Sequence, residues 1–238
     1  MEVKLSLSDK FAILRDIFHT LFPDLCLGCT KEPKAQKAAF CINCLHNMPY
    51  TDHFTNKEND VTKHFKGRIS LFHGAALLGF REGSIVKNML HSFKYKKRKE
   101  IGEILGEIAG KKFMESSIFI IPDMIIPVPV HPKKVKTRGY NQSAVFGLAI
   151  GKVIGVKLRD DIIIKEKWSE SQTGKSRTAR VKNVNEVFVL KQPELVFGKH
   201  ILLVDDVVTT GATLEACCLK LKEGNVGKIS VLSIAAAK

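Results

Sequence analysis

An apolar run near residue 201 is followed by two acids and a threonine-rich turn. The run Ile201 to Val204 is continuous and apolar, which predicts a buried strand. At the end of this strand the adjacent carboxylates of Asp205 and Asp206 can accept hydrogen bonds from a vicinal diol, such as the 2′- and 3′-hydroxyls of a ribose. Threonine hydroxyls, and backbone NH groups near Gly211 ahead of the next helix, can hold a monophosphate. The stretch with these properties comprises Asp205, Asp206, Val207, Val208, Thr209, Thr210, Gly211, Ala212 and Thr213.

Two alternatives compete with this interpretation. The stretch after Val204 could be an acidic strand end followed by a threonine-rich turn that binds nothing. A P-loop at Gly174, Lys175 and Ser176 is not supported, because Ser169 stands where that motif needs its first glycine.

Four of the six cysteines form two Cys-x-x-Cys pairs near the N-terminus. They are Cys26 with Cys29 and Cys41 with Cys44, and eleven residues separate the pairs. Each pair can place two thiolates on one ion, and four thiolates complete a tetrahedral site suited to zinc. A complete set of protein ligands leaves no open coordination position, so we expect a structural zinc rather than a catalytic one. Disulfides or an iron–sulfur centre are the alternatives.

The chain is strongly basic, with a formal net charge of +14 at pH 7. Such a charge favours acidic partners without saying which anion is bound. The cluster Lys94, Tyr95, Lys96, Lys97, Arg98 and Lys99, with Phe93 beside it, mixes cations and aromatic rings as proteins that bind single strands do. A solvated helix end is the alternative for the same cluster.

Alternating apolar runs and amphipathic segments must position these residues. The expected strands are 71–80, 125–130, 162–164, 201–204 and 229–235, and the expected helices are 84–95, 99–112, 143–154 and 214–222. This alternation predicts an α/β fold with a parallel sheet flanked by helices. A further amphipathic helix is expected from Asp9 to Phe22.

From about Ile69 the pattern changes to apolar runs alternating with amphipathic helices, so we expect two domains with a boundary near residue 60. Residues 1–60 would hold the N-terminal helix and a small zinc ribbon with four cysteine ligands, and residues 61–238 the α/β domain. The sequence contains no apolar run of the roughly 20 residues that a membrane-spanning helix needs. Its N-terminus also lacks the features of a secretory signal, so we expect a cytoplasmic protein without membrane insertion.

The stretch from Val204 to Thr213 resembles the motif with which type I phosphoribosyltransferases bind 5-phosphoribosyl 1-diphosphate (PRPP). Further motifs lie between the Cys pairs and this stretch, namely Lys94-Tyr95, Pro127-x-Pro129, Arg138-Gly139-Tyr140-Asn141-Gln142, and Gln172-Thr173 with Arg180 and Asn183. These motifs, in this order with the two Cys pairs and the PRPP motif, resemble the ComF family, competence-associated proteins that join a zinc ribbon to a phosphoribosyltransferase-like domain.

The resemblance implies roles for further segments. Residues 127–142 correspond to the turn that receives the diphosphate, where Arg138, with Lys134 and Lys136, would meet its charge. Residues 168–183 resemble the mobile loop that closes over the ligand. The resemblance also implies Mg²⁺ bound with PRPP, and a role in handling single-stranded DNA during natural competence, where proteins of the DNA-uptake machinery are possible partners.

Three functions remain open on the sequence. The first is a phosphoribosyltransferase with an unknown acceptor, in which Asp205 and Asp206 are the catalytic acids that hold the ribose. The second is a DNA-handling protein that keeps the PRPP site as a sensor or structural element. The third is a zinc-ribbon module that docks on a protein partner.

Overall fold

The computed structural model describes residues 25–34, 38–81, 84–166 and 187–237. The helix expected from Asp9 to Phe22 lies outside the described residues. The chain forms two compact units, residues 1–48 and residues 49–238. Within the described residues, no helix is long and apolar enough to cross a bilayer.

In the first unit, the described residues 25–34 and 38–48 contain little regular structure. Its helix α2 (Ile42–His46) has five residues, and a single bridge joins Leu25 to Pro33. Cys26, Cys41 and Cys44 are nevertheless buried. In the described part of this unit the cysteines therefore form the interior together with the buried side chains of Leu27, Phe40 and Met48.

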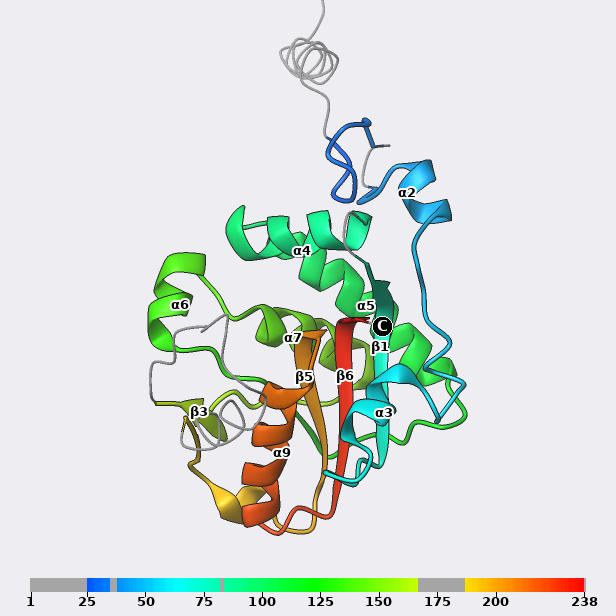
Figure 1. The fold of residues 1–238 in the computed structure, drawn as a ribbon. Helices are drawn as coiled ribbons and strands as arrows, with labels where there is room; N and C mark the ends of the chain where they lie inside the picture. The colour runs from blue at the N-terminus through cyan, green and yellow to red at the C-terminus, as the bar shows by residue number, and fades with distance from the viewer. Residues whose placement is uncertain (1–24, 35–37, 82–83, 167–186, 238) are drawn as a thin grey trace, which may run out of the picture. The chain divides into compact units, whose positions relative to one another are not determined.

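The second unit is built on a four-stranded parallel sheet, flanked by helices (Figure 1). The strand order is β1-β6-β5-β2, with bounds β1 (His73–Phe80), β2 (Met124–Pro127), β5 (His200–Val208) and β6 (Lys228–Ala237). The predicted α/β fold with a parallel sheet is confirmed. The strand expected over 125–130 is shorter than predicted, because the chain leaves the sheet after Pro127.

Helices cover both faces of this sheet. Their bounds are α3 (Asp60–Phe65), α4 (Ile85–Tyr95), α5 (Lys99–Glu115), α7 (Gln142–Ile154) and α9 (Ala212–Glu223). Alternate residues of β5 point to opposite faces. Leu203 joins the core cluster that contains Leu214 of α9, whereas Val204 lies against Gly147 of α7. Figure 1 shows α9 in front of the sheet.

Helices α5 and α7 approach each other closely at Gly106. A Cβ atom at this position would lie 2.6 Å from the carbonyl oxygen of Phe146 and 2.5 Å from the Cβ of Ala149. The absence of a side chain at Gly106 therefore lets α5 pack on α7, which carries Ser143 toward the end of β5.

Several short elements were not predicted. The helix α3 is held by a capping box in which Asn59 accepts from Val61 and Thr62. The helix α6 (Pro132–Arg138) begins with a proline and ends at Gly139, which has a φ of 86°. The predicted strand at 162–164 is present as β3 (Ile163–Lys165), but it pairs antiparallel with β4 (Phe188–Leu190) outside the main sheet. A short 3₁₀ helix, η1 (Pro193–Leu195), follows β4.

The compact units divide after residue 48, not after residue 60 as the domain prediction has it. Residues 49–60 lie on β1: Tyr50 forms a bridge with Leu78, and the NH of Thr51 donates to the carbonyl of Leu77. Because these contacts are made by the backbone, the residue types of this short polar segment could not predict them.

Candidate functional site

The motif stretch forms the end of β5, a short turn and the first turn of α9. The strand continues to Val208, four residues beyond the predicted end, because β6 runs beside it and pairs Asp205 with Ser233 and Val208 with Ala236. Asp205 and Asp206 therefore lie inside the strand rather than after it. The turn that follows them consists of residues 209–211.

The turn places backbone NH groups at the start of a 12-residue helix. Gly211 precedes α9 with a φ of 74°, a conformation that favours glycine. The N-cap residue Gly211 has no side chain to cap this helix, and the NH of Ala212 makes only a long bond of 3.4 Å to the Thr210 hydroxyl oxygen, so the positive dipole end of the helix can receive an anion. Thr209, Thr210 and Thr213 are exposed at the same place.

The Asp205 carboxylate lies between α7 and the backbone of its own strand. Its Oδ1 accepts hydrogen bonds from the Ser143 hydroxyl at 3.0 Å and from the NH of Asp206 at 2.8 Å. Burial, followed by the adjacent charge of Asp206, raises the pKa of Asp205 to about 7. This carboxyl is consequently poised to change its charge near neutral pH.

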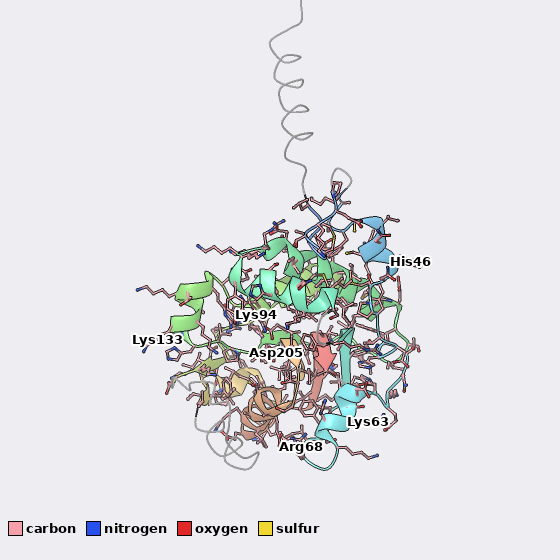
Figure 2. All side chains as sticks on the ribbon, turned by 45° about the horizontal axis from the view of Figure 1, so that its top comes forward. His46, Lys63, Arg68, Lys94, Lys133 and Asp205 are labelled. Carbon is pink, nitrogen blue, oxygen red and sulfur yellow. The ribbon has the colours of Figure 1, made fainter. Side chains whose placement is uncertain are left out.

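The Asp206 carboxylate points to another helix. Its Oδ2 lies 2.8 Å from the ammonium of Lys94, in the last turn of α4. The two neighbouring acids are thus held by different elements, Asp205 by α7 and Asp206 by α4. Figure 2 labels Lys94 and Asp205 close together.

The segment predicted to receive a diphosphate approaches the same end of the sheet. The NH of Val128 donates to the carbonyl of Val204 at 2.8 Å, which sets the segment beside β5. Asn141 caps α7 by accepting from the NH of Ser143, and its amide donates to the carbonyl of Val128 at 3.0 Å. One side chain therefore ties the two ends of the segment together.

Arg138 lies at the end of α6, within this segment. Its guanidinium donates to Oε1 of Gln142 at 3.0 Å and lies 5.6 Å from the centre of the Tyr95 ring. Of the two other predicted cations, Lys134 is partly exposed and Lys136 is exposed. The structure thus brings Arg138 next to the last turn of α4, beside the partner of Asp206.

Of the two aromatic residues in and beside the predicted basic cluster, only one is at the surface. Phe93 is fully buried and offers no surface to a ligand, so this part of the prediction was wrong. Phe93 faces inward because it lies seven residues, about two helical turns, after Val86, on the apolar side of α4. Tyr95, which the predicted cluster also includes, is 62% exposed, and the centre of its ring lies 5.0 Å from that of His91.

One cation near the site was not predicted. Lys165 of β3 is partly buried, and its ammonium lies 5.2 Å from the centre of the Phe188 ring. Burial, together with the nearby charge of Lys134, lowers the pKa of Lys165, and Asp205 opposes this effect. Lys165 closely precedes the predicted mobile loop, but a single lysine in a short strand carries no functional signal.

The residues of the predicted mobile loop, Gln172, Thr173, Arg180 and Asn183, lie outside the described residues.

The four paired cysteines come together in the first unit. Their sulfur atoms all lie within 4.8 Å of one another, and those of Cys29 and Cys41 are 3.9 Å apart. Sulfurs bound tetrahedrally to one zinc ion lie about 3.8 Å apart, given a Zn–S bond of about 2.3 Å. The Cys26 sulfur accepts from the NH groups of Gly28 at 3.3 Å and Cys41 at 3.2 Å. The donor set therefore fits a zinc ribbon.

Backbone NH groups around Cys26 favour the ionised, thiolate form of its side chain. Burial opposes its ionisation, but the NH groups of Cys41, Cys29 and Gly28 outweigh burial and lower the pKa to about 7. Gly28 is required for this packing, because a Cβ atom there would lie 2.9 Å from the Cys44 sulfur.

Comparison with known proteins defines the class of the larger unit. Residues 134–237 match the phosphoribosyl transferase domain family. The solved structure of the glutamine phosphoribosylpyrophosphate amidotransferase of B. subtilis is similar to this chain, with a TM-score of 0.41 and 15% sequence identity. The similar region covers 60% of this chain and 30% of the amidotransferase chain. The family match and the parallel sheet establish a phosphoribosyltransferase-like domain.

Relatives of similar length define the family more closely. Competence protein F of Haemophilus influenzae is 25% identical over 94% of this chain and 95% of its own length. Competence protein ComFC of Bacillus subtilis is 25% identical over 90% of this chain and 85% of its own. The DNA utilization protein YhgH of Salmonella typhi is 30% identical over 57% of this chain and 61% of its own. The chain is a homologue of the ComF proteins, and the predicted family resemblance is confirmed.

Proposed function

We propose that this protein binds PRPP together with Mg²⁺ at the end of β5. The observation that carries the proposal is the pair Asp205 and Asp206, followed within six residues by Gly211 and the start of α9, where Gly211 supplies no capping side chain. In this arrangement the two carboxylates accept hydrogen bonds from the ribose hydroxyls. The 5′-phosphate is held by the NH groups and hydroxyls of the turn, from Val207 and Val208 through Thr213.

The diphosphate of PRPP is placed against the segment from Pro127 to Gln142. Arg138 is oriented there by Gln142 and contributes a positive charge that a diphosphate oxygen can approach. Mg²⁺ bound with PRPP supplies further positive charge at the diphosphate. A transferase of this kind would form its oxocarbenium-like transition state at the anomeric carbon, with the ribose oriented by the acids.

Calorimetric titration with PRPP and Mg²⁺ tests this proposal. The double variant Asp205→Asn, Asp206→Asn should bind at least about tenfold more weakly, because each change removes a charged acceptor worth on the order of 1.5–3 kcal/mol. Wild-type affinity in the double variant would show that these acids do not face the ribose. Release of pyrophosphate in the presence of an acceptor would then identify a transferase, whereas binding without release would identify a sensor.

A second proposed activity is the binding of single-stranded DNA at the end of α4. Tyr95, Lys96, Lys97, Arg98 and Lys99 are all exposed there, which gives one aromatic ring and four cations in consecutive positions. Bases of a single strand can stack on such a ring while the cations meet the phosphates. The names of the relatives, which refer to competence and DNA utilization, support this assignment.

Three further proposals concern the metal, the cellular location and the protein partners. We propose a structural zinc in the four-cysteine cluster of residues 1–60, a cytoplasmic location, and proteins of the DNA-uptake machinery as partners. Retention of one zinc per chain after purification without added metal, measured by elemental analysis, tests the first of these. Protein without metal, or with paired disulfides, would contradict it.

A further inference from the structure

The ion pair between Lys94 and Asp206 lies mostly out of contact with solvent. The Lys94 side chain is 23% exposed and the Asp206 side chain 16%. A buried ion pair is weak support for stability, since the loss of hydration offsets much of the attraction between the charges. Because Asp206 is one of the two acids of the motif, this pair points to a role in ligand binding.

Both neighbours of Lys94 in sequence contact the segment that is proposed to receive the diphosphate. The hydroxyl of Tyr140 donates to the backbone carbonyl of Phe93. The guanidinium of Arg138 lies over the ring of Tyr95 at 5.6 Å. The last turn of α4 is thus attached to this segment on either side of Lys94, while the Lys94 ammonium reaches β5. Lys94 occupies the place where the ribose acids and the diphosphate segment meet.

We infer that Lys94 is a further PRPP-binding residue, which orients the Asp206 carboxylate and at the same time donates a hydrogen bond to an oxygen of the diphosphate. An ammonium group has three donors, so it can contact a carboxylate and a phosphate oxygen together. This inference rests on the proposed function, because it assigns a role within the same PRPP site. Lys94 itself lies outside the motif at the end of β5, in a helix more than 100 residues earlier in the chain.

The charges around Asp205 give this inference a second consequence. Asp205 faces the carboxylate of Asp206, the ammonium groups of Lys94 and Lys165, the Ser143 hydroxyl and the Cys217 thiol. The positive charge of Lys94 lowers the pKa of Asp205, which burial and Asp206 raise. Without Lys94, the site should keep its proton to a higher pH, and PRPP binding should be lost at a correspondingly higher pH.

Calorimetric titration of PRPP with Mg²⁺, repeated between pH 6 and pH 9, tests the inference on the full-length chain. Lys94→Met should bind about 10- to 100-fold more weakly than the wild type, as expected for the loss of a charge-assisted hydrogen bond. Lys94→Gln should show the same loss, and Lys94→Arg a smaller one. Lys87→Met is the matched control, because Lys87 is an exposed lysine of the same helix; it should bind like the wild type.

The pH profile distinguishes a role in the site from a merely structural one. The midpoint at which affinity is lost on acidification should move upward in Lys94→Met and Lys94→Gln, while the thermal unfolding of both variants remains cooperative. Wild-type affinity and an unchanged midpoint in both variants would overturn the inference about Lys94 but leave the proposed PRPP binding standing. A wild-type protein that does not bind PRPP would overturn the proposed function, and this inference with it.

Discussion

The pKa of the Asp205 carboxyl is raised to about 7, mainly by burial and then by the charge of Asp206. In the unfolded chain an aspartate has a pKa of about 3.9. Between these two values the folded state holds a proton that the unfolded state has released. The free energy of unfolding therefore loses a contribution as the pH rises from about 4 through 7. The acid that is proposed to bind the ribose is thus a cost to stability at neutral pH.

This cost predicts the behaviour of the variant Asp205→Asn. An asparagine is neutral at every pH, so the variant should unfold at a higher temperature than the wild type at pH 8. The difference should shrink at pH 5, where the wild-type carboxyl is also protonated. Thermal unfolding followed by circular dichroism at both pH values measures it. An equal difference at pH 5 and pH 8 would mean that the ionisation of Asp205 is not coupled to folding.

At the scale of the element, the last turn of α4 carries the proposed DNA-binding surface. Tyr95→Ala should weaken the binding of a labelled single-stranded oligonucleotide, because a stacked base contributes about 1–3 kcal/mol. Replacement of Lys96, Lys97, Arg98 and Lys99 by alanine should lower both the affinity and its dependence on salt. Fluorescence anisotropy at several salt concentrations measures both quantities.

A charge-matched control separates this surface from the general effect of a basic protein. Lys66, Lys111, Lys152 and Lys157 are exposed lysines on other elements. Their replacement by alanine removes the same charge and should leave most of the affinity in place. If both quadruple variants lose affinity and salt dependence equally, α4 is not a specific DNA-binding element.

The cysteine cluster is the second element that a substitution can isolate. Cys44→Ser removes one buried sulfur ligand and leaves three, so we expect loss of the metal and of the folded structure of residues 25–34 and 38–48. The parallel sheet should remain folded, because its core is made by residues of the larger unit. Metal content and the methyl region of the NMR spectrum report the two effects separately. A variant that keeps one zinc per chain would contradict the proposed four-ligand site.

The apolar runs were sufficient to predict most strands and helices. Four consecutive buried residues, Ile201 to Val204, mark β5, and the helical spacing of Val86 and Phe93 marks α4. The continuation of β5 through Asp205 to Val208 could not be predicted, since it depends on pairing with β6 rather than on apolar side chains. Helix α3 was missed because six residues held by one capping box give too short an apolar pattern.

The candidate site was predictable in its residues but not in its contacts. The acids and the turn lie within one short stretch of the sequence, and the paired cysteines lie within another. Their residue types and spacing were therefore enough to predict both groups. The contacts of Asp205 with Ser143, and of Asp206 with Lys94, join residues from distant parts of the chain. The difference between Phe93 and Tyr95 depends on which face of α4 meets the core.

At the scale of the whole molecule, buried histidines near the amino ends of the strands set a limit on acid stability. Burial, followed by the charges of Lys57, His200 and Lys228, lowers the pKa of His73 to about 4. Burial also lowers the pKa of His200, whose Nε2 lies 2.8 Å from the Ser230 hydroxyl. An unfolded histidine, with a pKa of about 6.5, binds a proton that the folded one does not. The contribution of these two histidines to stability should therefore fall as the pH drops below about 6.5 toward 4, opposite in sign to the contribution of Asp205 in the same range.

The variant His73→Phe tests this dependence. It removes one group that takes up a proton on unfolding, and its ring can pack on Phe72 and Phe119, which already contact His73. Urea unfolding at pH 7 and pH 5 should show a smaller loss of stability on acidification than in the wild type. His91→Phe, at an exposed position, should behave like the wild type. Equal losses in wild type and His73→Phe would show that this histidine does not limit acid stability.

The central claim is that the end of β5 and the start of α9 hold a phosphorylated ribose. The most direct test is a titration of ¹⁵N-labelled protein with PRPP and Mg²⁺, followed by the backbone amide resonances. The account predicts that the largest shifts fall on residues 205–213, because their NH groups meet the phosphate and their strand carries the ribose acids. The same resonances should stay unchanged in the double variant Asp205→Asn, Asp206→Asn at equal ligand concentration. Shifts confined to other parts of the chain, or equal shifts in the variant, would contradict it.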